Sequence, residues 1–178
     1  MTYIALLRGV NVGGNNRVVM ADLRLCFEAA GFSEVRTYIN SGNVIFESPL
    51  ADKKKLVRLC EASIKKQFGF RVICSVITAT ELRTALEQAP AWWGKAPDHS
   101  HNAIFAITPS TAQQVSQAIG PIKPEYERVK VVEPIIFWSA ARTTVGRTRY
   151  SKVMGTAAYQ QITIRNANTT KKLLELVS

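Results

Sequence analysis

The sequence predicts an α+β protein that is a tandem duplication of a ferredoxin-like β-α-β-β-α-β unit. The prediction rests on the order of the expected elements, which is strand, helix, strand, strand, helix, strand, helix in each half of the 178 residues. A stretch with two tryptophans and one proline, residues 91–101, interrupts the periodic pattern between the halves. We therefore expect a first subdomain at residues 1–90, a linker at 91–101 and a second subdomain at 102–178.

Apolar periodicity defines the elements of the first half. Residues 3–7 form a short apolar run, and apolar residues then recur at helical spacing from Met20 to Ala30. The turn Asn40–Asn43 joins two further apolar stretches, which predicts a hairpin. The remaining elements are an amphipathic helix that includes Lys53 and Phe68, a strand over 70–77 and a helix over 80–89.

The second half repeats this order. A strand over 103–107 precedes a helix that Thr108 can cap, with Pro109 at its first position. We expect a last helix capped by Asn168. Between these helices we expect two strands over 128–132 and 135–138, a short helix over 151–159 and a strand over 161–164.

The loop from Arg8 to Arg17, which joins the first strand to the first helix, has two interpretations. Its three glycines and two arginines could present backbone N–H groups and guanidinium groups to an oxyanion. Alternatively, the loop is a connector whose Gly and Asn residues adopt positive φ angles and hold neighbouring backbone groups. It has neither the GxGxxG nor the P-loop spacing, and Gly and Asn are common loop residues, which favours the connector.

Charge is the strongest compositional signal. The formal net charge is +10, and residues 134–174 contain no Asp or Glu. The seven cations of this region are Arg142, Arg147, Arg149, Lys152, Arg165, Lys171 and Lys172. Such a surface predicts an anionic partner, either a nucleic acid or a phosphate-bearing small molecule, or else counter-charge from salt ions.

Other compositional features point to a protein of the cytoplasm. No apolar run approaches the roughly 20 residues that span a bilayer, so we expect no membrane partner. The apolar run at residues 3–7 is also too short for the core of a signal peptide. The three cysteines are odd in number and far apart, which suits reduced core residues.

Two segments near the C-terminus complete the candidate anion site. Residues 142–152 mix arginines with hydroxyls, which suits phosphate binding or a merely solvated basic loop. Residues 165–171 open the last helix, and we expect Arg165 and the Arg8 loop to border one cleft between the subdomains. The candidate anion-binding residues are Arg8, Asn11, Gly13, Gly14, Asn15, Arg17, Arg147, Arg149, Lys152, Arg165 and Asn166.

No metal, cofactor or catalytic residue is predicted. Asp98, His99 and His101 lie close in sequence, but two histidines and one carboxylate fall short of a zinc pattern. Ser41 lies in a turn rather than in the strand-to-helix elbow of a hydrolase, and no base can be assigned to it.

Three stretches resemble the domain of unknown function 1697 (DUF1697) family, bacterial proteins of about this length. They are Tyr3–Gly14, Arg36–Val44 and Thr163–Thr169. The resemblance implies an α+β fold with a duplicated ferredoxin-like unit and no established activity. The family pattern usually has Gln where Asn40 stands and Trp where Ala167 stands. If that Trp stacks on a ligand in relatives, this chain lacks the stacking surface.

The first functional hypothesis is a binding protein for a phosphate-bearing partner, with nucleic acid favoured over a mononucleotide. The RNP1 signature of RNA-recognition domains is absent, however. A second hypothesis is an enzyme acting on a small anionic substrate held by the Arg8 loop and Arg165. A third is a ligand-free structural or regulatory module that uses a sheet edge or Trp92 and Trp93 as its interface.

Overall fold

The computed structural model describes residues 1–14 and 16–178, and within them the chain divides into two compact units. The first unit spans Met1–Ala79 and the second spans Thr80–Leu176. Each unit contains a four-stranded antiparallel sheet, and five α-helices lie in the part of the chain that the structure describes. The predicted mixture of α and β structure is therefore confirmed.

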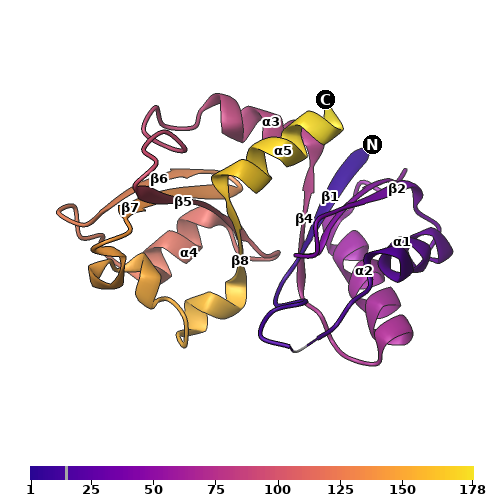
Figure 1. The fold of residues 1–178 in the computed structure, drawn as a ribbon. Coiled ribbons are helices and arrows are strands. Elements are labelled where there is room, and N and C mark those ends of the chain that lie inside the picture. Colours follow the sequence, from indigo (N-terminus) through magenta and orange to yellow (C-terminus); the bar gives the residue numbers. More distant parts are fainter. Residues whose placement is uncertain (15) are drawn as a thin grey trace. The chain divides into compact units, whose positions relative to one another are not determined.

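The first unit has the strand order β2-β3-β1-β4. Its two helices supply the apolar residues of a core that includes Leu23, Phe27 and Leu56 together with Tyr3 and Phe46 of the sheet. Figure 1 shows both helices on one side of this sheet. The elements are β1 (Thr2–Leu7), α1 (Met20–Ala29), β2 (Ser33–Tyr38), β3 (Asn43–Glu47), α2 (Lys53–Phe68) and β4 (Cys74–Thr78).

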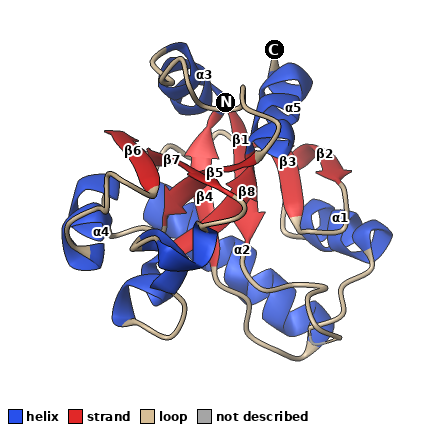
Figure 2. Cartoon of the chain, turned by 60° about the vertical axis from the view of Figure 1, so that its left-hand side comes forward, coloured by secondary structure: helices blue, strands red, loops and turns tan. Residues whose placement is uncertain are grey.

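The second unit has the corresponding order β6-β7-β5-β8. One face of this sheet packs on α4, which Figure 2 shows beside the strands, and on short 3-10 turns. The elements are β5 (His99–Ala106), α4 (Ala112–Ile119), β6 (Glu127–Val132), β7 (Ile135–Ala141), β8 (Ile162–Asn166) and α5 (Ala167–Val177), preceded by α3 (Ala79–Glu87). The 3-10 turns are Val145–Arg147, Tyr150–Lys152 and Ala157–Gln161.

Both helix caps predicted in the second half are wrong. The hydroxyl of Thr111, not Thr108, caps α4, and it forms a capping box with Gln114. The carboxylate of Glu133 also accepts hydrogen bonds from the first two backbone N–H groups of α4, a contact from outside the helix. At α5 the capping residue is Asn166 rather than Asn168, because β8 continues without a loop into the helix.

Further element predictions differ from the structure, and the strand expected over 70–77 begins only at Cys74. The short helix expected over 151–159 is replaced by 3-10 turns. The strand expected from residue 103 begins four residues earlier, at His99, inside the segment assigned to the linker. Residues His99–Asn102 are polar, a composition that is typical of a loop, so the sequence did not indicate that they extend the strand. In the structure they pair with β7.

The carboxylate of Glu127 organises the turns that follow β7. It is 3% exposed and accepts hydrogen bonds from the backbone N–H groups of Lys123, Arg149 and Tyr150 and from the indole of Trp138. Four N–H donors compensate for removing the carboxylate from water. Glu127 therefore fixes the first residues of the Tyr150–Lys152 turn against the sheet.

Gly42 joins the hairpin turn to the loop that follows β1. Its carbonyl accepts a hydrogen bond from the Leu7 amide, and its φ angle is 74°. A Cβ at this position would lie 2.5 Å from Cγ2 of Val10 and 2.7 Å from Cβ of Leu7. The close approach explains why the hairpin turn requires glycine here.

Among the described residues, no helix combines the length and apolar composition needed to cross a bilayer.

We expect Gly42→Ala to lower the free energy of unfolding of the first unit by about 2 to 4 kcal/mol, from left-handed backbone strain plus overpacking. Gly69→Ala is the matched control, because Gly69 has a φ of 79° but nothing within 4 Å of the added methyl. Urea denaturation of both variants measures the difference. Equal losses for the two would show that the contact of Gly42 with Val10 and Leu7 is unimportant.

Glu127→Gln should destabilise the protein by about 2 to 3 kcal/mol, since the amide NH2 of glutamine faces N–H donors where a charged acceptor was. Glu125→Gln, at an exposed position in the same segment, is the control. Thermal and urea unfolding measure both. A loss below about 0.5 kcal/mol for Glu127→Gln would contradict the anchoring role assigned to this carboxylate.

Candidate functional site

A polar pocket of about 340 Å³ lies in the second unit, where β5 extends beyond the end of β8. Its lining contains no Asp or Glu. The lining residues are Gly94, Lys95, Ala96, Pro97, His99, Ser100, His101, Asn102, Arg142, Asn166, Ala167 and Asn168. We call this cavity the α5 pocket, because the first residues of α5 form one of its walls.

The register of the sheet explains why the pocket lies there. Asn102 of β5 pairs with Asn166, the last residue of β8, so residues 99–101 of β5 have only β7 as a paired neighbour among the described strands. The chain turns into α5 directly after Asn166. The edge of β5 and the start of the helix therefore face the same space.

The loop before β5 closes another side of the pocket and is anchored by Trp93. This side chain is 3% exposed, and its indole N–H donates to the carbonyl of Asn102 at 2.9 Å. Its ring packs edge-on against Phe137 with 4.9 Å between the ring centroids. Trp93 therefore packs within the second unit.

His101 has an unusual hydrogen-bonding state. Its Nε2 lies 2.9 Å from the carbonyl of Ala96, and since a carbonyl only accepts, Nε2 carries a proton. The other ring nitrogen, Nδ1, is buried and has no hydrogen-bond partner among the described residues. It can accept a hydrogen bond from a ligand hydroxyl, or donate one to an oxyanion when the ring is protonated.

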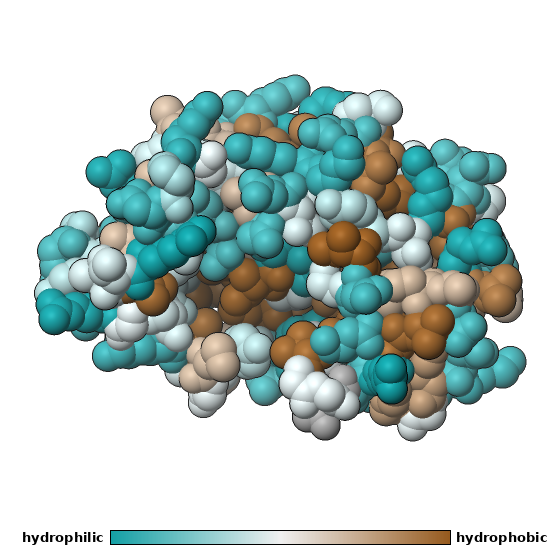
Figure 3. Space-filling view, in the orientation of Figure 1, coloured by the Kyte–Doolittle hydropathy of each residue, from teal (hydrophilic) through white to brown (hydrophobic). Residues whose placement is uncertain are grey.

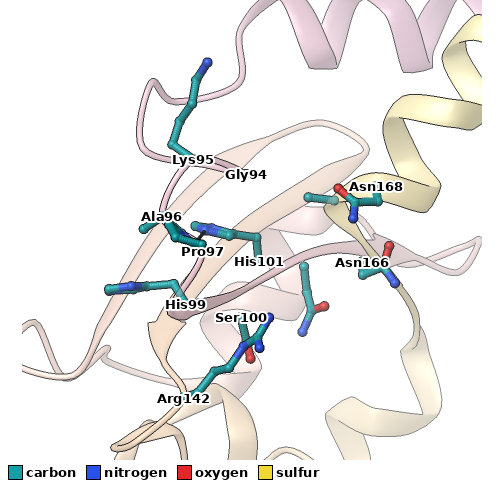
Figure 4. Close-up of a pocket in the computed structure, with 12 residues that line it drawn as sticks. Gly94, Lys95, Ala96, Pro97, His99, Ser100, His101, Arg142, Asn166 and Asn168 are labelled. Atoms are coloured by element: carbon teal, nitrogen blue, oxygen red, sulfur yellow. Dashed lines mark hydrogen bonds between the residues drawn. The ribbon is translucent and has the colours of Figure 1, made fainter.

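Arg142 supplies a cation at the end of β7. Its backbone N–H donates to the carbonyl of Asp98 at 3.1 Å, which positions the residue beside the pocket. Figure 4 shows its guanidinium next to Ser100, with Asn166 and Asn168 across the pocket, while Lys95 extends away from the others. Within the described part of the chain Arg142 has no salt bridge to a carboxylate within 4.0 Å.

The carboxylate of Asp98, which interacts electrostatically with Arg142, has its own partner. Asp98 lies 2.9 Å from Nδ1 of His99, and this hydrogen bond lowers the pKa of Asp98 below its usual value. The positive charge of Arg142 lowers the pKa of Asp98 further. The carboxylate does not line the pocket, so the lining itself carries Lys95 and Arg142 without an opposing negative charge.

The first turn of α5 offers backbone donors. The side chain of Asn166 accepts a hydrogen bond from the Thr169 amide at 2.8 Å, which caps the third residue of the helix. Ala167 and Asn168, the first two residues, both line the pocket. Backbone N–H groups at a helix N-terminus attract anions.

A second hollow, of about 490 Å³, lies in the first unit at the start of α1. It includes three of the predicted anion-binding residues, Asn11, Gly14 and Arg17, and the N-cap residue Val19 makes no side-chain hydrogen bond to the helix. Gly13 lies in the same loop, whereas the predicted Asn15 lies outside the described residues.

The hydrogen bonds of the Arg8–Arg17 loop are those expected of a connector. The side-chain Nδ2 of Asn11 donates to the backbone carbonyls of Val18 and Asn40. Its side-chain oxygen accepts a hydrogen bond from the backbone N–H of Val18. Positive φ angles occur at Gly9, Asn11, Gly13, Gly14 and Asn16. Arg8 is half-buried, and its backbone N–H donates to the carbonyl of Ile73.

Two of the predicted arginines of the C-terminal region contact the protein itself. The Nε of Arg149 donates to the Ile119 carbonyl at the end of α4, where a cation also suits the helix dipole. The guanidinium of Arg147 lies over the ring of Tyr126, 5.7 Å from its centroid. Lys152 is exposed and does not line the α5 pocket.

Arg165 is buried, at 7% exposure, and burial lowers the pKa of its guanidinium to about 10. Its Nη1 donates to Oγ1 of Thr163 and to the carbonyl of Ile164. The cleft that we expected Arg165 to share with Arg8 would lie between the two units, and it stays a prediction.

Most residues of the α5 pocket were not among the predicted anion-binding residues; only Asn166 was. Sequence reasoning considered His99 and His101 as metal ligands and Arg142 as part of a basic run, but did not join them. The sequence signal that could have located the pocket was the polar stretch His99–Asn102, which directly precedes the apolar residues of β5.

The comparisons with known proteins identify the family. A family described as "Protein of unknown function (DUF1697)" matches residues 1–137, which include the first two stretches of the resemblance and end before the third. No curated protein matches the chain. A solved structure of a conserved bacterial protein from Streptococcus pneumoniae is 31% identical, covers 99% of this chain and 98% of its own, and has a TM-score of 0.87. The chain therefore belongs to the DUF1697 family.

Proposed function

We propose that this protein binds a small phosphate-bearing ligand in the α5 pocket. The observation that carries the proposal is the gathering of Arg142, His101 and the first residues of α5 around one cavity whose lining contains no carboxylate. A guanidinium group binds phosphate through paired hydrogen bonds, and the helix N-terminus adds backbone donors and positive potential.

The size and lining of the cavity support a small molecule over a nucleic acid strand. A volume of about 340 Å³ lies within the range of small-molecule sites, which is about 300–1,000 Å³. Arg147 and Arg149, which would extend a basic surface for a long polyanion, are engaged with Tyr126 and with Ile119. These two arginines therefore already have partners within the fold.

The Arg8–Arg17 loop remains a second proposed anion site, supported by the hollow at the start of α1. Arg17 lines this hollow, and the helix lacks a side-chain cap, so its first N–H groups suit an acceptor from outside. An enzyme acting on a small anionic substrate is compatible with either site, but no general base is assigned.

We also propose that the two sheets derive from one ferredoxin-like unit that was duplicated. The support is the strand order of the two sheets. When the strands of each unit are numbered along the chain, both sheets have the order second, third, first, fourth. The units differ between their third and fourth strands, where the first has α2 and the second has 3-10 turns.

Arg142→Ala should weaken the binding of inorganic phosphate and of ribose 5-phosphate by about tenfold or more, because it removes a charged donor from the cavity. Isothermal titration calorimetry measures both ligands. Arg128→Ala is the matched control, since Arg128 is exposed on β6 and lines neither the α5 pocket nor the hollow at the start of α1. Equal affinities for Arg142→Ala and the control would contradict the proposed function.

A third variant, Arg17→Ala, separates the two proposed sites. If the α5 pocket holds the ligand, this variant binds ribose 5-phosphate as the wild type does. If binding is lost in Arg17→Ala and retained in Arg142→Ala, the ligand belongs to the Arg8–Arg17 loop instead.

A further inference from the structure

An apolar cavity of about 220 Å³ adjoins the α5 pocket in the same unit. The two cavities share Ser100 and Asn102 of β5 as lining residues. The rest of the apolar cavity includes Trp138, Tyr150, Ile164 and Met154. Hydrophobic side chains also reach the surface of this unit, where Figure 3 shows brown residues at the floor of a hollow.

The sheet register connects the two cavities through one row of side chains. Asn102 pairs with Trp138 of β7 on one side and with Asn166 of β8 on the other, so the three side chains form a row across the sheet. Trp138 lines the apolar cavity, Asn166 lines the α5 pocket, and Asn102 lines both. The row spans two strand spacings, which is about 10 Å.

The polar groups of the aromatic side chains are already satisfied. The indole N–H of Trp138 donates to Glu127, and the hydroxyl of Tyr150 lies 2.9 Å from that of Ser116. Burial raises the pKa of Tyr150, so this side chain stays neutral at physiological pH. The cavity is therefore lined by aromatic and aliphatic groups, with Ser100, Asn102 and Ser151 as its polar residues.

We propose that the two cavities form one site for a mononucleotide. The phosphate lies in the α5 pocket with Arg142 and the start of α5, and the base lies against Trp138 and Tyr150. A ligand whose ring is attached directly to the phosphate is too short to reach from the α5 pocket to Trp138. In a mononucleotide, the pentose between the phosphate and the base supplies a spacer of suitable length. The inference rests on the proposed function, because it places the phosphate in the same pocket.

The walls of the apolar cavity suit a planar base. Aromatic faces stack on bases, and the thioether of Met154 is a soft, adaptable contact at the exposed edge, where this residue is 69% exposed. Glu127 holds the Arg149 and Tyr150 amides, so the wall that carries Tyr150 is fixed to the sheet. The site for the base is therefore preformed.

The test compares AMP and UMP with ribose 5-phosphate, which lacks the base. The wild-type protein should bind at least one nucleotide about fivefold to a hundredfold more tightly than ribose 5-phosphate, as measured by calorimetry. Binding of ribose 5-phosphate with no preference above twofold for either nucleotide would overturn this inference alone. Failure of all three ligands to bind would overturn the proposed function as well.

Two variants locate the base. Ser151→Phe fills the apolar cavity and should reduce nucleotide affinity to that for ribose 5-phosphate, which should itself be unchanged. Met154→Ala, at a position that is 69% exposed, should reduce the preference for the nucleotide by about twofold to fivefold. Ile122→Ala, another exposed apolar residue of this unit, is the control. A nucleotide preference that is the same in Met154→Ala as in the wild type and control would overturn the placement of the base.

Discussion

The candidate site depends on the early end of β8 beside the central strand β5. β8 has five residues and β5 has eight, and the pairing of Asn102 with Asn166 leaves the first residues of β5 without a neighbour on that side within the described strands. Because Asn166 also caps α5, the chain changes from strand to helix at the same point. This single junction brings a strand edge, backbone donors and Arg142 to one cavity.

The high positive charge of the second half has more than one role. Arg149 satisfies the carbonyl end of α4, and Arg147 covers Tyr126, so these cations contribute to the fold. Glu127, the carboxylate that anchors this segment, lies at the start of β6, outside the acid-free region. A run of basic residues in a sequence therefore measures the charge of a surface, but it does not identify which side chains face a ligand.

The elements of the first unit were largely predictable from apolar periodicity, since Tyr3–Leu7, the α1 stripe and the hairpin have clear patterns. The second unit was harder, because Glu133 caps α4 from 20 or more residues away and Asn166 serves both a strand and a helix. The α5 pocket depends on strand register and on the loop anchored by Trp93. Neither the strand register nor the contact of Trp93 can be inferred from a short stretch of sequence. His101 and Arg142 therefore could not be assigned to one site.

The central claim is that phosphate binds at the junction of β5, β8 and α5. The most direct measurement is a titration of the 15N-labelled protein with inorganic phosphate, followed by backbone amide chemical shifts. The account predicts saturable shifts at Ala167, Asn168 and Ser100, which line the pocket. Saturable shifts confined to residues 1–79, or no saturable shifts at these three amides, would contradict it.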